Sequence, residues 1–302
     1  MDVVFATCQK QPGLTPPDAL LGAELERRGA RVTVAPWDAI SPTTGSSRVV
    51  CLRSTWDYHL RWPEFERWIG SFADRPGSLW NPPETVLWNA DKVYLRELAE
   101  AGLAVPLTHW FEPGERPDHV AILRQWGLSR AVLKPRISAT AYGTYLLSPD
   151  LGLSQSDWRH LNEVGGLVQA FVPEVETQGE LSLVFTDGEF SHAVRKRPAR
   201  GDFRVQSDFG GRWEAVTVAA SVRDFGEAVL LAASRSWLYA RVDVVETSGG
   251  PILMELELIE PQLFLTPSAA IRLADGLLSR TRPADAASGM PPDRSSGVGL
   301  EQ

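Results

Sequence analysis

The chain has 302 residues, of which 43% are hydrophobic and 23% charged, a composition typical of one large globular domain or two to three small ones. Its 38 acidic residues outnumber 30 lysines and arginines, and the net charge of -8 argues against a surface that binds nucleic acid. No run approaches the roughly 18 apolar residues of a membrane span, and the N-terminus lacks a basic signal region. We therefore expect a soluble, cytoplasmic protein without a membrane partner.

The N-terminal part alternates strand and helix patterns. Apolar runs at 2–7, 31–37 and 48–52 predict strands, and an amphipathic helix is expected at about 16–30. This order is typical of a parallel sheet. Ligands bind beyond the carboxyl ends of such strands, so the candidates for substrate contact are Arg53, Ser54, Thr55, Asp57 and Tyr58. A solvated loop without a ligand is the alternative. Both cysteines lie in or beside apolar runs and are expected to be buried free thiols: Cys8 and Cys51.

The rest of the chain mixes helices with strands and hairpins. Strands or hairpins are expected at 104–111, 131–135, 145–148, 166–172, 180–196 and 240–258. Helices are expected near Pro63 and at about 91–101, 154–162 and 223–238. Asp187-Gly188 is a strong two-residue turn signal inside the first long hairpin. The end of the chain, 281–302, is rich in Pro, Gly, Ser and Asp and is expected to be disordered.

The hairpin at 240–258 has one acidic and one apolar face. Glu255 and Glu257 share a face, and a turn symmetric about Gly249 places Asp243 opposite Glu255. Neighbours at i and i+2 lie roughly 6.5 Å apart and cross-strand pairs about 5 Å, so three carboxylates should converge and need a cation. Oxygen ligands without Cys or His suit Mg²⁺. An exposed acidic edge or another register is the alternative. The opposite face should bury Ile252, Met254, Leu256 and Leu258.

A second constellation centres on Lys134. This residue ends the apolar run "AVLKP", where an amine is costly unless it meets an anion. The loop "RISATAYGT" follows, with hydroxyls, backbone N–H groups and Gly143, and such a loop can wrap phosphate oxygens. It matches neither the P-loop nor the dinucleotide-binding glycine motif. A mobile hairpin loop is the alternative.

The order of these pieces resembles the ATP-grasp superfamily of carboxylate–amine ligases. The matching pieces are "WNADK", "VLKP", "VQAFV", "GDFR", "VDVV" and "MELELIEP", spread over residues 85–280. The stretch "KRPARGDFRVQSDFGG" is similar to the glutathione synthetase and ribosomal-protein glutamate ligase branch. "LRSTWDYHLR" together with "ELELIEPQLF" resembles a bacterial group that includes the D-cycloserine cyclo-ligase, which closes a ring on O-ureido-D-serine.

This resemblance implies an α/β fold with α+β character in its ATP-grasp part. A parallel-sheet pre-ATP-grasp domain at 1–105 would bind substrate. Two α+β subdomains, at 106–172 and 173–280, would clasp ATP, the second carrying the metal site. Residues 281–302 would form the disordered tail. The resemblance also implies ATP and one or two Mg²⁺ ions as cofactors, with Mn²⁺ as a substitute, and a monomer or homodimer.

Site residues are carried over from the family motifs. Lys92, Lys134 and Arg204 would act on the phosphates and the acyl group. The ATP-binding set would add Ser138, Thr140, Gly143, Gln169, Phe171 and Val172, with Glu174, Glu176 or Glu180 on the ribose. The metal acids would be Asp243, Glu255 and Glu257, although the family usually has Asn at the last position. Substrate contacts would be Arg53 as a carboxylate clamp, Glu260 and Gln262 toward an amine, and Thr55, Asp57 and Tyr58.

The implied reaction transfers the γ-phosphate of ATP to a carboxylate and lets an amine attack the acyl phosphate, within one molecule or between two. Phosphoryl transfer needs positioning and charge neutralisation more than a covalent nucleophile, which fits these residues. Two alternatives stay open. One is an ATP-grasp kinase acting on a small molecule, and the other is a nucleotide-binding module without turnover.

Overall fold

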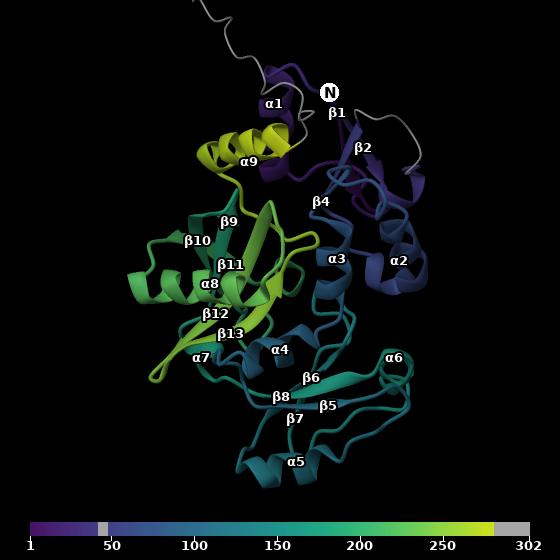
Figure 1. Cartoon of the computed structure of the whole chain (residues 1–302). Helices are drawn as coiled ribbons and strands as arrows, with labels where there is room; N and C mark the ends of the chain where they lie inside the picture. The colour runs from purple at the N-terminus through teal and green to yellow at the C-terminus, as the bar shows by residue number, and fades with distance from the viewer. Residues whose placement is uncertain (42–47, 281–302) are drawn as a thin grey trace, which may run out of the picture.

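The N-terminal part of the molecule is built on a parallel sheet (Figure 1). The structure is a computed structural model that describes residues 1–41 and 48–280, so the predicted tail at 281–302 lies outside the described residues. The sheet has the order β2-β1-β3-β4, and the expected parallel strands are confirmed. Its strands are β1 (Asp2–Thr7), β2 (Arg31–Pro36), β3 (Arg48–Leu52) and β4 (Leu79–Trp80).

Four helices belong to this part of the chain. Helix α1 (Pro16–Arg27) begins after Thr15, whose hydroxyl caps the first turn by accepting from the Asp18 N–H. Helix α2 (Trp62–Gly70) has Pro63 in its first turn, as expected. The predicted helix at 91–101 is shorter, α4 (Tyr94–Glu100), and a helix that the sequence did not predict precedes it, α3 (Pro83–Ala90).

An antiparallel sheet of order β5-β8-β6-β7 forms the middle of the chain. Its strands are β5 (Thr108–Phe111), β6 (Ala131–Pro135), β7 (Tyr145–Leu147) and β8 (Gly166–Ala170). Helices α5 (His119–Trp126) and α6 (Trp158–Val164) pack on it through a core that includes Phe111, Leu133 and Val168. The sheet and α5 form one end of the molecule (Figure 1).

The third sheet has the order β11-β10-β9-β12-β13. Its strands are β9 (Glu180–Thr186), β10 (Glu189–Arg197), β11 (Arg212–Val216), β12 (Tyr239–Thr247) and β13 (Gly250–Glu257). The predicted turn at Asp187-Gly188 is confirmed, with both residues at positive φ. Helix α8 (Ala220–Ala233) covers one face of this sheet (Figure 1), and the short α7 (Glu174–Thr177) precedes β9.

The last helix, α9 (Pro267–Arg280), lies beside α1, far from it in sequence (Figure 1). Leu273 and Leu277 of α9 share a core with Leu21 and Leu25 of α1. The sequence analysis did not predict this helix. It crosses back to the N-terminal sheet, so a core common to both ends of the chain fixes the third sheet against the first. No helix within the described ranges is both long enough and apolar enough to span a membrane.

The hairpin of β12 and β13 has the predicted register at Asp243, which lies opposite Glu255. A bulge follows, because Val244 is opposite Leu253 and Met254 is the extra residue. The strand therefore buries Leu253 and Leu256 in the core. The prediction that Met254 packs on this face is wrong: the bulge changes the alternation and leaves Met254 at a pocket.

Arg53 connects the first sheet to the chain beyond β13. Its side chain is fully buried, and its Nη2 atom lies 2.8 Å from Asp18 Oδ1 and 3.0 Å from the carbonyl oxygen of Pro261. Tyr239 adds to this contact, because its hydroxyl lies 3.0 Å from the carbonyl oxygens of both Leu52 and Ile259. The first and third sheets are thus joined by buried polar contacts.

Replacing Arg53 with methionine should destabilise the protein by about 3–5 kcal/mol, because Asp18 would be left as an unpaired buried charge. Urea denaturation measures this loss. Arg31→Met is the matched control: Arg31 pairs with Asp2 at the surface, and its removal should leave the free energy of unfolding close to the wild-type value. Equal losses in the two variants would contradict the structural role of Arg53.

Candidate active site

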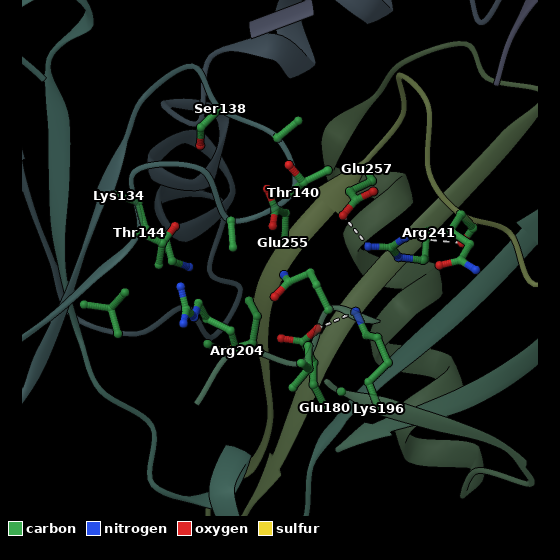
Figure 2. Close-up of a pocket in the computed structure, with 18 of the residues that line it drawn as sticks. Lys134, Ser138, Thr140, Thr144, Glu180, Lys196, Arg204, Arg241, Glu255 and Glu257 are labelled. Atoms are coloured by element: carbon green, nitrogen blue, oxygen red, sulfur yellow. Dashed lines mark hydrogen bonds and ion pairs between the residues drawn. The ribbon is translucent and has the colours of Figure 1, made fainter. Parts of the chain in front are cut away.

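One pocket collects side chains from all three sheets. The loop after β3 contributes Trp56 and Tyr58, the middle sheet contributes Lys134 and Gln169, and the third sheet contributes several charged side chains. Figure 2 shows that these charged groups point toward a common space. The charged groups of the third sheet and its adjoining loop are Glu180, Lys196, Arg204, Asp208, Arg241, Glu255 and Glu257.

The predicted lysines lie on either side of this space. Lys134, on β6, donates to the Gln169 side chain at 3.0 Å, and burial lowers its pKa despite the nearby Glu255 charge. Lys92 lies 2.8 Å from Glu255 Oε1 and donates to the Ser138 carbonyl oxygen at 3.0 Å. The structure therefore brings both lysines close to Glu255, one from each side of the pocket.

The loop at 136–144 crosses the pocket with an unusual backbone. Thr140 and Ala141 have positive φ values of 52° and 56°, a strained conformation for residues with a side chain. Gly143 also has positive φ, and a Cβ there would lie 2.7 Å from the Cγ atom of Pro135. Of the predicted loop residues, Ser138 and Thr140 line the pocket, with Thr144 in addition. Gly143 shapes the loop without lining the pocket.

The tip of this loop touches the first domain through aromatic rings. The Tyr142 ring lies between two histidines, with centroid distances of 5.0 Å to His59 and 5.3 Å to His160. His59 is buried, and neither ring nitrogen has a hydrogen-bond partner among the described residues. Burial lowers the pKa of His59 to about 4. The loop at 136–144 therefore packs against the neutral imidazole of His59 through Tyr142.

The apolar end of the pocket is formed where β8 leaves the middle sheet. Gln169, Phe171 and Val172, the residues expected at the adenine, line it together with Val175 and Phe203. Three glutamates were expected as alternatives for binding the ribose, and they differ in whether they line the pocket. Glu180 lines the pocket and pairs with Lys196 at 2.6 Å. Glu176 pairs with Arg130 outside the pocket, and Glu174 does not line it either.

Arg204 is held in place before any ligand binds. Its Nη2 atom lies 2.8 Å from Asp202 Oδ2, and its guanidinium stacks 3.6 Å from the centre of the Phe209 ring. The Arg204 charge lowers the pKa of Asp202 to about 2. Arg204 lines the pocket, where Figure 2 shows it near Lys134.

The three predicted metal acids are neutralised by the protein's own cations. Asp243 accepts from Arg241 Nη2 at 2.8 Å, from Lys196 Nζ at 3.0 Å and from the Ser182 hydroxyl at 2.6 Å. Although burial opposes ionisation, Arg241 and Lys196 hold the Asp243 pKa far below its ordinary value. Arg241 also pairs with Glu257 (Figure 2). Burial raises the pKa of Glu257 to about 7, and Arg241 opposes that rise.

The predicted position of Asp243 opposite Glu255 is confirmed, and each of the three acids faces a lysine or arginine. Within the described ranges, no group of three or more His, Cys, Asp or Glu side chains is arranged to hold a metal ion. The reason is that Arg241 and Lys92 take up the carboxylates that a metal would otherwise bind. The role of these acids as metal ligands stays a prediction.

The sequence analysis missed Arg241 and Lys196. A signal for Arg241 was present, because residues two apart on a strand share a face and "RVD" places Arg241 beside Asp243. Lys196 was harder to find. It lies opposite Glu180 only because a bulge between Phe190 and His192 shifts the register of the first hairpin.

The predicted substrate contacts divide into two groups. Tyr58 and Glu260 line the pocket, whereas Arg53, Thr55 and Asp57 do not. The expectation that Arg53 clamps a substrate carboxylate is wrong, because Asp18 and a backbone carbonyl already occupy its guanidinium. Asp57 accepts from the Trp37 indole at 2.9 Å, and Thr55 is fully buried.

Comparison with known proteins identifies the family. Residues 3–81 match the family model "D-cycloserine synthetase DcsG, N-terminal domain". The chain is 30% identical over 284 residues to the cycloserine biosynthesis protein DcsG of Streptomyces lavendulae, which covers 84% of this chain and 90% of that protein. The chain belongs to the DcsG family of ATP-grasp ligases. Its predicted resemblance and fold class are confirmed.

Solved structures agree with membership of the DcsG family. The crystal structure of D-cycloserine synthetase DcsG superposes with a TM-score of 0.77 at 26% identity, covering 93% of this chain and all of the other. The D-alanine–D-alanine ligase of Bacillus anthracis gives 0.65 at 16% identity, covering 93% and 97%. The second likeness shows the common fold alone.

Stability of this DcsG-family protein should fall as the pH drops from 6.5 to 4, because the unfolded chain protonates His59 near its ordinary pKa of about 6.5 while the native protein keeps it neutral down to about 4. His59→Gln removes the titrating imidazole and, with it, this contribution to the pH dependence of stability. Between pH 7 and pH 5 the wild type should lose about 2 kcal/mol more than the variant, measured by urea denaturation at each pH.

His109→Gln is the matched control, since His109 is exposed on β5. It should keep the wild-type dependence on pH. A His59→Gln variant whose stability follows pH as the wild type does would contradict the assignment.

Proposed function

We propose that the protein is an ATP-dependent ligase that activates the carboxylate of an amino-acid-like substrate as an acyl phosphate, which an amine then attacks, with ADP and phosphate released. The observation that carries this proposal is that Lys92, Lys134 and Arg204 line one pocket, in which Lys92 pairs with Glu255. Three cations converging from separate elements suit a polyphosphate. Membership of the DcsG family supports the same reaction class.

In this proposal ATP binds in one orientation along the pocket. Its adenine lies at the apolar end, against Gln169, Phe171 and Val172, and its ribose reaches Glu180. Its phosphates extend toward Lys134, Lys92 and the loop that contains Ser138 and Thr140. All of these residues except Lys92 lie on or beside the middle and third sheets, and all of them line the same pocket, which supports the assignment. Residues 106–172 and 173–280 are then the two subdomains that clasp the nucleotide, and 1–105 is the substrate domain.

Mg²⁺ fits the donor chemistry of the acidic side of the pocket. Glu255 and Glu257 line it, Asp243 lies opposite Glu255 on the neighbouring strand, and all three offer only oxygen. An ion bound there would neutralise phosphate charge during transfer. Each of these carboxylates now faces a lysine or arginine, so the ion competes with Lys92 and Arg241 for them.

The chain's own residues have distinct tasks in the transfer. Arg204, fixed by Asp202 and Phe209, faces the transferred phosphate and the acyl group without a further cost of ordering its side chain. The loop at 136–144, held by Lys92 through the Ser138 carbonyl and by Tyr142 against His59, keeps water from the acyl phosphate. Tyr58 and Glu260 form the wall that faces the acceptor side of the substrate.

The substrate is proposed by analogy with the relative. That protein takes part in cycloserine biosynthesis, and the same ring closure, from O-ureido-D-serine to D-cycloserine, is the first reaction to test here. In such a cyclisation the activated carboxylate and the attacking nitrogen belong to one molecule, and the carbamoyl group on that nitrogen leaves as carbon dioxide and ammonia. The pocket therefore needs a single small substrate beside ATP.

A phosphate-release screen tests the function directly. The protein is incubated with ATP, Mg²⁺ and amino acids of both configurations, including O-ureido-D-serine, and products are analysed by mass spectrometry. We expect ADP, free phosphate and one new C–N bond per ATP consumed. A product that retains the phosphate would identify a kinase, and absence of turnover with the whole panel would contradict the proposal.

Asp243→Asn and Glu255→Gln should each lower Mg-ATP turnover by at least about 100-fold, because each removes a charge from the proposed metal and phosphate site. Initial rates of ADP formation measure this loss, and melting curves check that the variants are folded. Glu246→Gln is the control, since Glu246 lies on the same strand, outside the pocket lining, and pairs with Arg195. Full activity in both site variants would refute the assignment.

A further inference from the structure

The segment that follows β13 is fastened to the protein at successive carbonyl groups. Residues from strands β10 and β12 and from the loops after β3 and β4 contact it. The donors are Asn81 to the Leu258 oxygen at 2.7 Å, Tyr239 to Ile259 at 3.0 Å, Arg53 to Pro261 at 3.0 Å and Arg241 to Gln262 at 3.2 Å, and His192 Nε2 lies 3.0 Å from the Leu263 oxygen. This backbone is therefore rigid before any ligand arrives.

Glu260 lies in the middle of this rigid segment. The backbone carbonyl groups around it are hydrogen-bonded, whereas its side chain has no such partner among the described residues. The residue is 8% exposed and lines the pocket. Across residues 1–41 and 48–280, no group donates a hydrogen bond to its carboxylate or forms an ion pair with it. A buried carboxylate without a partner is costly, so its retention points to a ligand that supplies the partner.

The protein has no spare cation for this carboxylate in the described part of the pocket. Arg53 is held by Asp18 and the Pro261 carbonyl, and Arg241 by Asp243, Glu257 and the Gln262 carbonyl. Burial raises the pKa of Glu260 well above its ordinary value, and the charges of Arg241 and Arg53 oppose that rise. Their hydrogen bonds, however, go elsewhere, and Glu257 adds a second negative charge nearby.

Aromatic residues complete the surroundings. Tyr58 and Trp56 line the same pocket as Glu260, and burial raises the pKa of the Tyr58 hydroxyl. An organic cation gains from ring faces and from one or two carboxylates. A Mg²⁺ ion needs about six oxygen ligands in near-octahedral order, which one carboxylate beside aromatic rings does not supply.

We propose that Glu260, with Glu257 behind it, binds the positively charged amino group of the substrate and makes the enzyme selective for amino acids with a free ammonium group over their des-amino counterparts. This inference rests on the proposed ligase function. In this proposal Arg53 is a positioning residue for Glu260, because it donates to the carbonyl oxygen of the adjacent Pro261. It also explains why a carboxylate is tolerated at Glu260 without a protein partner.

The test compares two acids that differ only in the amino group, O-ureido-D-serine and 3-(ureidooxy)propanoic acid. In the wild type we expect kcat/KM for the amino acid to exceed that for its des-amino counterpart by at least tenfold. Glu260→Gln keeps the size of the side chain and removes its charge. It should raise KM for the amino acid at least tenfold, leave KM for ATP unchanged and abolish the preference. Glu66→Gln, at an exposed glutamate of α2, is the control and should keep the wild-type preference.

Stability and metal dependence provide readouts that a purely structural or metal-binding role would not share. Without substrate, Glu260→Gln should melt at a temperature no lower than the wild type, because an amide of the same size replaces a buried carboxyl group that has no partner. Equal use of both acids by the wild type, a preference retained in Glu260→Gln, a marked loss of stability, or a raised requirement for Mg²⁺ would each overturn the inference. Absence of phosphate release with every acid in the wild type would instead refute the ligase function itself.

Discussion

The buried ion-pair network around Asp243 is the interaction on which the pocket depends. Asp243 is bound by Arg241 and Lys196, and each of these cations reaches one further acid, Glu257 and Glu180. Buried charges are tolerated only in such mutual contact, so each member fixes the others. Four strands, β9, β10, β12 and β13, thereby hold their functional groups on one face. Arg241 extends this order to the Gln262 carbonyl, and thus to the segment that carries Glu260.

This network also determines how a ligand can enter. Lys92 pairs with Glu255, and Arg241 pairs with Glu257, so these two carboxylates already have cationic partners. A nucleotide alone would add anions, and a metal ion alone would add a cation, and each would leave buried charge uncompensated. The two together bring charges of both signs. If Glu255 holds the metal ion as proposed, Lys92 would be free to bind a phosphate instead, and simultaneous binding of both would be favoured electrostatically.

The sequence predicted what depends on local patterns and failed where distant segments meet. Asp187-Gly188 predicted its hairpin, and Asp243 was correctly placed opposite Glu255, although the bulge at Met254 and not the turn alone sets that pair. Arg53 was misassigned because its partner, Asp18, lies on a helix 35 residues away, a contact that no local pattern reveals. The same holds for α9, which packs on α1, and for Lys196, whose position depends on a bulge. The pocket wall at Met254 shifted because a bulge reverses alternation.

The contacts between the three parts of the chain differ in strength, and this bears on how the pocket opens. The first and third sheets share a core through α1 and α9 and are joined by Arg53, Asn81, Asn89 and Tyr239, all of them buried. The middle sheet is tied to its neighbours by more exposed links, such as Arg136 with Asp91, and by Lys92 with the Ser138 carbonyl. Separating the first sheet from the third would expose apolar surface and leave buried polar groups without partners. Moving the middle sheet breaks mainly solvent-accessible pairs. Opening for ATP therefore costs least if the middle sheet moves. Glu260 and the metal acids then stay fixed, and the nucleotide-covering loop returns to them when the pocket closes.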